Sequence, residues 1–463
     1  MKYIHELEIE LGTNAKLPWE YNETLQYPIR ASIWPSLFVQ PGFSLLKLLK
    51  TKEEWNPNLL LTSSRLFVFL ASFLCDFIVW KLATYLFRDK KIVYNILLLW
   101  MSSFSNWVLM TRTLNNSVET LFLLVLFYVI TVKFNKPVDS LYSVFPSVIS
   151  TVGVFLRPTF VLFAFIPLVN WLYKIIYSVK RPFQCLCLGI ISALVAAVLL
   201  IISDTLFYRE ALSLSTLVLT PLNFILYQLD QSNLAIHGIH PRYTHFIINM
   251  PLLVGPIYAL ILFFMAKAMV KRRNPLKLSN TVMALLLIFS LFGISSAPHQ
   301  EFRFLMPLVP ICCLMSGPIF HNLSKNSVTL CIAFHIVYNM IVGLFFSFLH
   351  QSTSVLLASY LYNFKSQVQY TDIYLFCSYT FPNFLLASFM PSIPRIHDLG
   401  SANIDDIKTF LPQLSQTSAL LAPCHLLNEQ MVEKSVHFSP VFSGECLPSE
   451  LRSDLLSFCL LSK

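Results

Sequence analysis

Ten long apolar segments occupy most of the first 350 residues, and they constrain the fold more than any other feature of the chain. A helix needs ~20 apolar residues to cross a bilayer, and the shorter segments would borrow flanking residues to reach that length. The runs are continuous, whereas the strands of a transmembrane barrel would alternate between apolar and polar residues. We therefore predict an all-α polytopic membrane protein with about ten transmembrane helices. The segments are residues 61–87, 92–110, 118–132, 141–156, 160–172, 185–207, 246–266, 281–294, 304–320 and 328–349.

The composition of the chain excludes most other classes of protein. Hydrophobic residues make up 56% of the 463 positions and charged residues only 12%. A soluble globular protein has about 25% charged residues. A soluble chain of this size could not hide so much apolar surface from water, and a disordered, collagen-like or small disulfide-stapled chain has a different composition.

Basic clusters follow every odd-numbered apolar segment, and this alternation predicts the orientation of the chain in the membrane. Loops rich in Lys and Arg face the cytosol. The N-terminal segment, the even-numbered loops and the C-terminal tail would then face the opposite, lumenal side. The formal net charge of +9 is therefore a topology signal, and nucleic-acid binding is not needed to explain it. The clusters contain Arg88, Lys90, Lys91, Lys133, Lys136, Lys174, Lys180, Arg181, Lys267, Lys271, Arg272, Arg273, Lys277 and Lys325.

Three regions follow from this pattern. Residues 1–60 form a lumenal segment with interfacial helices, and Asn22 begins a glycosylation sequon there. Residues 61–350 form the transmembrane domain. Residues 351–463 are less hydrophobic and are predicted to form a small lumenal α+β cap. A disulfide among Cys377, Cys424, Cys446 and Cys459 of this cap is compatible with an oxidising lumen, but the pairing stays open.

Solitary arginines among polar residues mark the predicted lumenal face. Arginine binds phosphate oxygens through two parallel hydrogen bonds and stays charged when it is partly desolvated. These arginines therefore indicate a site at the membrane boundary that handles a phosphate-bearing lipid. Interfacial anchoring is the alternative for any single one of them. They are Arg112, Arg157, Arg209, Arg242 and Arg303.

Two carboxylates accompany these arginines. Glu119 would lie one turn inside a helix that begins near Asn115, and a carboxylate within a span is costly and needs a partner. The expected partner is Arg112 or a polar group of a neighbouring helix. Glu301 opens the ninth apolar segment, where it and Arg303 would flank one ligand.

Four histidines lie on the same predicted face. Hydrogen bonding to a sugar or phosphate is the favoured role. A metal site is conceivable, but Gly238 and Pro241 break any helix that would align the first two histidines. We predict no metal. The residues are His237, His240, His245 and His299.

Three of these segments together resemble a known family. The run Thr-Arg-Thr-Leu-Asn-Asn-Ser-Val-Glu ends at Glu119, Gly-Val-Phe-Leu-Arg-Pro-Thr ends at Thr159, and His-Gln-Glu-Phe-Arg-Phe begins at His299. They resemble the signatures of glycosyltransferase family 22, the dolichyl-phosphate-mannose-dependent mannosyltransferases of the endoplasmic reticulum. The resemblance implies the GT-C fold, an inverting transfer of mannose from dolichyl-phosphate-mannose at the lumenal face, and no cofactor besides this donor.

The stretch from Leu219 to His245 resembles the family members that add the fourth mannose to the glycosylphosphatidylinositol (GPI) precursor. Several alternatives stay open. The chain could add the third GPI mannose or a mannose of the N-glycan precursor, or it could be a non-catalytic subunit. A transporter would also have ten spans, but its polar residues would lie at the midplane of the bilayer rather than at one face.

The resemblance also assigns roles to the candidate site residues. Arg242, Arg303 and His245, with Arg112 and Arg157, would bind the donor phosphate. The family's His-Pro-Asp-Glu motif, which carries the catalytic acid, would fall upstream of Met1, so no catalytic residue is assigned. A truncated gene model, a shortened isoform or a catalytically inactive variant would each account for this. Sugar hydroxyls would be positioned by Glu119, Glu301, His237, His240 and His299.

Overall fold

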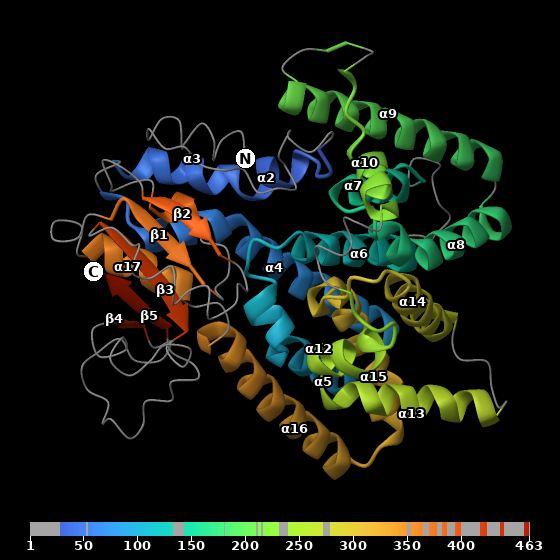
Figure 1. Cartoon of the computed structure of the whole chain (residues 1–463). Coiled ribbons are helices and arrows are strands. Elements are labelled where there is room, and N and C mark those ends of the chain that lie inside the picture. Colours follow the sequence, from blue (N-terminus) through green and yellow to red (C-terminus); the bar gives the residue numbers. More distant parts are fainter. Residues whose placement is uncertain are drawn as a thin grey trace. The chain divides into compact units, whose positions relative to one another are not determined.

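The computed structural model of the protein contains two compact units (Figure 1). The helical unit comprises Arg65–Val342 and the described part of 17–39, and the second unit includes Gln40–Ser64 and Gly343–Lys463. The described residues are 28–51, 54–132, 143–179, 181–209, 212–213, 216–230, 239–271, 278–349, 353–363, 370–376, 382–386, 394–399, 417–423, 436–438 and 458–462.

All ten apolar segments form helices, which confirms the predicted all-α membrane fold. Five of the described helices are long and apolar enough to cross a bilayer, and five more are shorter apolar helices. The elements of this region are α2 (Ile33–Phe38), α3 (Gln40–Leu49), α4 (Pro57–Leu86), α5 (Lys90–Ser102), η3 (Ser105–Leu109), α6 (Asn115–Val132), α7 (Val144–Leu156), α8 (Phe160–Ser178), α9 (Pro182–Arg209), α10 (Thr220–Leu229), η7 (His245–Asn249), α12 (Met250–Val254), α13 (Pro256–Lys271), α14 (Leu278–Ser295), η8 (Phe302–Leu305), α15 (Leu308–Asn322), α16 (Lys325–Leu344) and η9 (Phe345–Leu349).

At least four of the predicted spans, the second, seventh, ninth and tenth, divide into more than one helical element. The second segment divides into α5 and the π-helix η3. The seventh divides at Gly255, which has a φ of 70° and precedes Pro256. That conformation favours glycine, and an added Cβ would lie 2.7 Å from the ring of Tyr338. Local backbone chemistry thus divides a segment that hydropathy reads as one span.

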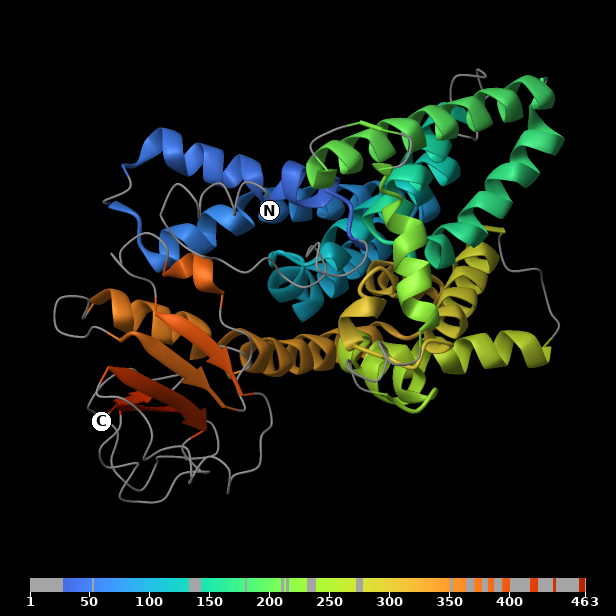
Figure 2. The same cartoon turned by 45° about the horizontal axis from the view of Figure 1, so that its top comes forward.

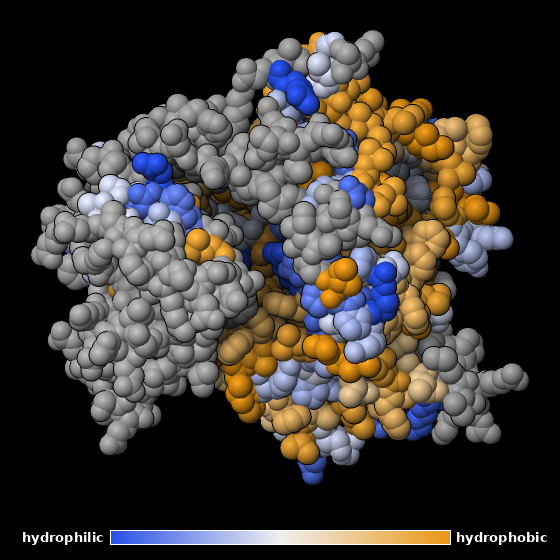
Figure 3. Space-filling view, in the orientation of Figure 1, coloured by the Kyte–Doolittle hydropathy of each residue, from blue (hydrophilic) through white to orange (hydrophobic). Residues whose placement is uncertain are grey.

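Helix packing brings the predicted site segments together. α7 contacts α6, α8 and α9, while α8 also contacts α14, and α15 packs against α5, α13 and α14. α8 and α9 meet at one end, where the chain turns sharply between them (Figure 2). The side chains of Ile190, Leu194 and Val198 on α9 are exposed. Apolar surface is prominent over α8 and α9 (Figure 3). Such a surface is suited to contact with lipid.

The segment 28–32, which we call the strap, is tied to α9 within the helical unit. Tyr208 Oη donates to the carbonyl oxygen of Arg30 over 2.6 Å. Both the backbone N–H and the hydroxyl of Ser32 donate to Asp204 Oδ1 at 2.7 Å. Asp204 is buried, so these bonds satisfy a carboxylate that would otherwise be costly inside a helical bundle.

The second unit contains the tail, which has α+β structure as predicted. The five strands among its described residues have the order β2-β1-β3-β5-β4. β1 pairs in parallel with β2 and β3, while β5 is antiparallel to β3 and β4. The elements are α17 (Thr353–Asn363), β1 (Asp372–Leu375), η10 (Asn383–Leu385), β2 (Arg395–Asp398), β3 (Ser418–Pro423), β4 (Val436–Phe438) and β5 (Phe458–Ser462).

Two predictions fall mainly on residues outside the described part. The sequon at Asn22 lies there, as do Cys377, Cys424 and Cys446 of the possible tail disulfide. Both therefore stay predictions. Six described cysteines are free thiols, namely Cys75, Cys185, Cys187, Cys312, Cys313 and Cys331.

Candidate functional site

A buried carboxylate at the start of α6 forms the first part of the site. Glu119 pairs with Arg157, with 3.2 Å between Oε2 and Nε, and the two side chains are 1% and 7% exposed. Thr159 Oγ1 donates to Glu119 Oε1 at 3.0 Å, and Asn116 Nδ2 donates to Oε2 at 3.2 Å. We predicted Arg112 or a polar group of a neighbouring helix as the partner, and the ion-pair partner is the arginine that ends α7.

The Arg-Pro-Thr turn explains why Arg157 reaches this carboxylate. A residue before proline is biased away from helical geometry. Arg157 accordingly has an extended conformation at the C-cap of α7, and Pro158 follows it. Arg157 Nη1 also donates to Asn116 Oδ1 at 3.2 Å. The turn therefore fixes the guanidinium between α6 and α7.

The second part of the site is the turn that leads into η8. His299 Nε2 lies 2.8 Å from Glu301 Oε1, and Arg303 Nη2 donates to the same oxygen at 2.9 Å. Arg303 Nε forms an ion pair with Glu301 Oε2 as well. Burial opposes ionisation of Glu301, but the hydrogen bonds and charges of His299 and Arg303 outweigh it and lower its pKa to about 2. Glu301 is therefore ionised at neutral pH.

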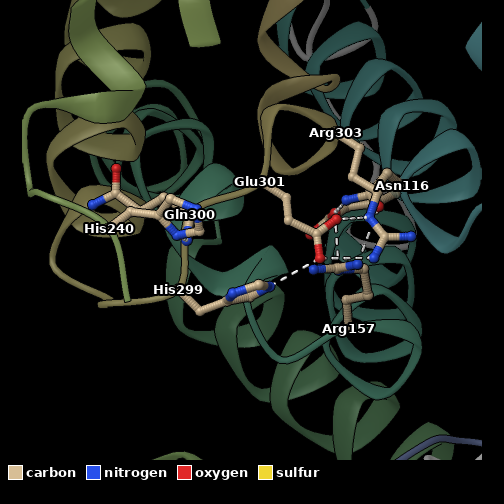
Figure 4. Close-up of polar contacts among 8 residues, drawn as sticks. Asn116, Arg157, His240, His299, Gln300, Glu301 and Arg303 are labelled. Atoms are coloured by element: carbon tan, nitrogen blue, oxygen red, sulfur yellow. Dashed lines mark hydrogen bonds and ion pairs between the residues drawn. The ribbon is translucent and has the colours of Figure 1, made fainter. Parts of the chain in front are cut away.

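Phe304 joins the two carboxylate clusters. Its ring centroid lies 5.1 Å from the Arg157 guanidinium carbon and 5.9 Å from that of Arg303. The ring of His299 lies 5.6 Å away in an edge contact. Figure 4 shows Asn116, Arg157, Glu301 and Arg303 grouped on one side, with His299 reaching toward them. The two arginines, each paired with a carboxylate, therefore approach a common aromatic ring.

Gln300 links this turn to the histidines. Its side chain is buried, accepts from the backbone N–H of His245 at 3.0 Å, and donates to the carbonyl oxygen of Ser295 at 3.0 Å. The ring centroids of His240 and His299 are 5.9 Å apart. His245 is completely buried, and its Nδ1 lies 2.9 Å from Asn249 Nδ2. Three of the four predicted histidines thus lie near one turn, while His237 is outside the described residues.

The remaining arginines are more scattered. Arg112 precedes α6 and is half-buried, whereas Arg209 at the end of α9 is exposed. Arg242 lies in a turn with an exposed side chain, and its carbonyl oxygen accepts a 3.5 Å hydrogen bond from Gln300 Nε2. Within the described residues, no group of three or more His, Cys, Asp or Glu could hold a metal ion.

Sequence reasoning missed several residues of the site. Arg30 of the strap is buried, and its charge acts on Glu119. Its guanidinium carbon lies 5.6 Å from the ring centroid of Phe224. Asn116, Thr159 and Gln300 lie inside the motifs that resemble the family signatures, and this position could have marked them as site residues. No local pattern marked Arg30, because its neighbours in the chain resemble an interfacial loop.

The fold of the helical unit is of the GT-C type, as its likeness to a solved structure shows. The structure aligns with ArnT from Cupriavidus metallidurans bound to undecaprenyl phosphate, with a TM-score of 0.54, 11% sequence identity, and coverage of 99% of this chain and 92% of that chain. The apo structure of the same protein aligns with a TM-score of 0.53. At this identity the likeness concerns the fold alone.

The chain belongs to the Alg9-like mannosyltransferase family, whose model matches residues 8–383. It is 30% identical over 349 residues to GPI mannosyltransferase 4 of Schizosaccharomyces pombe, covering 74% of this chain and 59% of that protein. It is 32% identical over 378 residues to human GPI alpha-1,2-mannosyltransferase 4, covering 74% of this chain and 62% of the human protein. The chain therefore spans less than two thirds of the length of these relatives.

Proposed function

We propose that the chain transfers mannose from dolichyl-phosphate-mannose to a lipid-linked glycan, as the fourth mannose of the GPI precursor. Its family and the names of its relatives in yeast and human support this reaction. The proposed location is the endoplasmic reticulum membrane, with the site facing the lumen. The donor lipid is the only small molecule that the proposal requires, with no separate cofactor.

The observation that carries the proposal is the meeting of two arginine–carboxylate clusters at Phe304. Arginines stabilise the charge that develops on a departing phosphate. Carboxylates and histidines in the same site can hydrogen-bond sugar hydroxyls. We assign the sugar to Glu119, Glu301, His237, His240 and His299. The donor phosphate is assigned to His245 and to Arg112, Arg157, Arg242 and Arg303.

The catalytic base is expected outside these two clusters. Transfer from a β-linked donor to an α-linked product inverts the sugar carbon, and one-step inversion requires a base at the acceptor hydroxyl. A pKa of about 2 makes Glu301 a poor proton acceptor at neutral pH. Glu119 already accepts hydrogen bonds from Thr159 and Asn116 beside its ion pair with Arg157. The family's His-Pro-Asp-Glu motif is the proposed source of the base.

A transfer assay with defined acceptors tests the proposal. Microsomes containing the full-length form receive labelled dolichyl-phosphate-mannose and either a trimannosyl or a dimannosyl GPI acceptor. We expect label to enter the trimannosyl acceptor only. Elongation of the dimannosyl acceptor would instead support addition of the third mannose. Donor binding without transfer to either acceptor would support a non-catalytic subunit and contradict the enzyme.

A further inference from the structure

Three polar side chains of α16 belong to neither carboxylate cluster. His335, Tyr338 and Asn339 all lie within the tenth predicted span. The side chains of His335 and Asn339 are buried. Polar side chains inside a membrane span are costly, and those that occur there have a partner or a function. The partners of these three are backbone groups at the breaks of two other spans.

Asn339 and His335 bind the backbone where the second predicted span is broken. Ser103, between α5 and η3, has an extended conformation that interrupts the helix. In a continuous helix the N–H of Phe104 would donate to the carbonyl oxygen four residues earlier. It donates instead to Asn339 Oδ1 at 3.0 Å. His335 Nε2 lies 3.1 Å from the carbonyl oxygen of Leu99 in α5.

Tyr338, the neighbour of Asn339, binds the break in the seventh predicted span. Gly255 follows α12 with a positive φ, and Pro256 has no N–H to donate. The carbonyl oxygen of Leu252, four residues before this proline, therefore loses its helical donor. Tyr338 Oη donates to that oxygen at 3.0 Å. Broken backbone inside a membrane protein needs such substitutes, because water is not there to supply them.

Each of these broken spans leads into one part of the candidate site. η3 is tied to α6, since Ser117 Oγ donates to the carbonyl oxygen of Leu109 at 3.0 Å, and α6 carries Glu119. α12 continues directly from η7, where the N–H of His245 donates to Gln300 Oε1 at 3.0 Å. α16 lies beside both α5 and α12 (Figure 1). One helix thus holds the backbone behind both parts of the site.

We propose that Tyr338 and Asn339 are positioning residues, which fix the two broken spans on α16 and so set the relative placement of the two parts of the substrate site. The inference rests on the proposed function and extends it to a helix that supplies none of the proposed substrate ligands. Successive residues of a helix point about 100° apart, so these two neighbours reach different spans from one place.

Hydrogen exchange of the purified full-length form in detergent tests the two contacts without requiring catalysis. Tyr338→Phe removes one hydroxyl, and Asn339→Leu removes the amide at similar volume. Loss of one buried hydrogen bond should speed local exchange roughly 2- to 10-fold. We expect faster exchange in peptides containing Phe104 for Asn339→Leu, and in peptides containing Gly255 for Tyr338→Phe. Each variant is the control for the other, and unchanged exchange at both breaks overturns the proposal.

Transfer kinetics separate positioning from a purely structural role. The kcat is measured per folded enzyme, well below the melting temperature of each variant. Misplaced site groups should lower kcat roughly 10- to 100-fold in both variants, with a smaller change in KM for dolichyl-phosphate-mannose. Thr329→Val, which removes a hydroxyl hydrogen bond within the first turns of α16, is the matched control and should keep wild-type kinetics.

The outcomes distinguish the positioning role from the function. Wild-type kcat in Tyr338→Phe and Asn339→Leu overturns the positioning role, even if both variants melt at a lower temperature. If Asn339→Leu does not fold, Tyr338→Phe alone decides. A fall in kcat as large in Thr329→Val would also overturn it, because any lost bond on α16 would then suffice. Absent transfer by the wild type would instead reject the proposed function.

Discussion

The two carboxylate–arginine pairs of the site use the same chemistry in different surroundings. Glu119 and Arg157 are 1% and 7% exposed, whereas Glu301 and Arg303 are 31% and 42% exposed. Desolvation makes the buried pair dependent on both partners, because a single remaining charge would be left unpaired. The exposed pair can exchange partners with a ligand at lower cost. We infer that both pairs contribute to the substrate site, the first with a fixed geometry and the second with freedom to exchange partners with the substrate.

The largest effect should come from breaking the buried pair. Glu119→Gln leaves the Arg157 charge buried without its carboxylate, so we expect a loss of about 3–5 kcal/mol of stability. Thermal unfolding in detergent measures it. Glu54→Gln is the control, since Glu54 forms an exposed pair with Lys50 and should leave the melting temperature unchanged. An equal fall in melting temperature in Glu119→Gln and Glu54→Gln would contradict the idea that burial makes the Glu119–Arg157 pair more important for stability.

Arg303→Gln should damage activity rather than stability. Its side chain is 42% exposed, so the melting temperature should stay near that of the wild type. Loss of a positioned donor at the reacting centre lowers kcat by about 10²–10³-fold. Mannose transfer and protein expression are measured together for Arg303→Gln and the wild type. Arg181→Gln, on the predicted cytosolic side, is the control. Retained transfer would contradict the role of Arg303.

Acid should weaken the exposed cluster over a defined pH range. The pKa of Glu301 is lowered to about 2, below the ~4.3 of an unperturbed glutamate. Its stabilising contribution is thus complete above the unfolded-state pKa and lost as the pH falls through about 2. His299→Gln removes one of the lowering hydrogen bonds and should shift this loss to higher pH. Melting curves from pH 6 downward, at roughly half-unit steps, compare the variant with the wild type; identical curves would contradict the His299 contribution.

Phe304→Leu should have the smallest effect. It removes the aromatic face beside Arg157 and Arg303, and a cation–π contact is worth about 0.5–1 kcal/mol at a partly exposed site. We expect a few-fold loss in kcat/KM and a slight fall in melting temperature. Phe334→Leu, an exposed position on α16, controls for the loss of an aromatic ring. A loss as large as that of Arg303→Gln would mean that Phe304 contacts substrate itself.

Hydropathy predicted the helices, and motifs named most residues of the candidate site, because both depend on residues close together in the chain. The pairing of Glu119 with Arg157 could not be read in this way, since it depends on how α6 packs against α7. Arg30 was missed for the same reason, because its position is set by bonds between the strap and α9. The break at Gly255 was locally visible as a Gly-Pro pair, but the surrounding hydropathy concealed it.

The link between Ser32 and Asp204 has a consequence for biosynthesis. The two residues are 172 positions apart. At the usual synthesis rate of 5–20 residues per second, Asp204 is made roughly 10–30 s after Ser32. When Asp204 is made, the two donors of Ser32 are already synthesised, and the hydroxyl of Thr220 follows 16 residues later. Substitutions in this part of α9 should therefore appear in cells as slow maturation and degradation of the nascent chain.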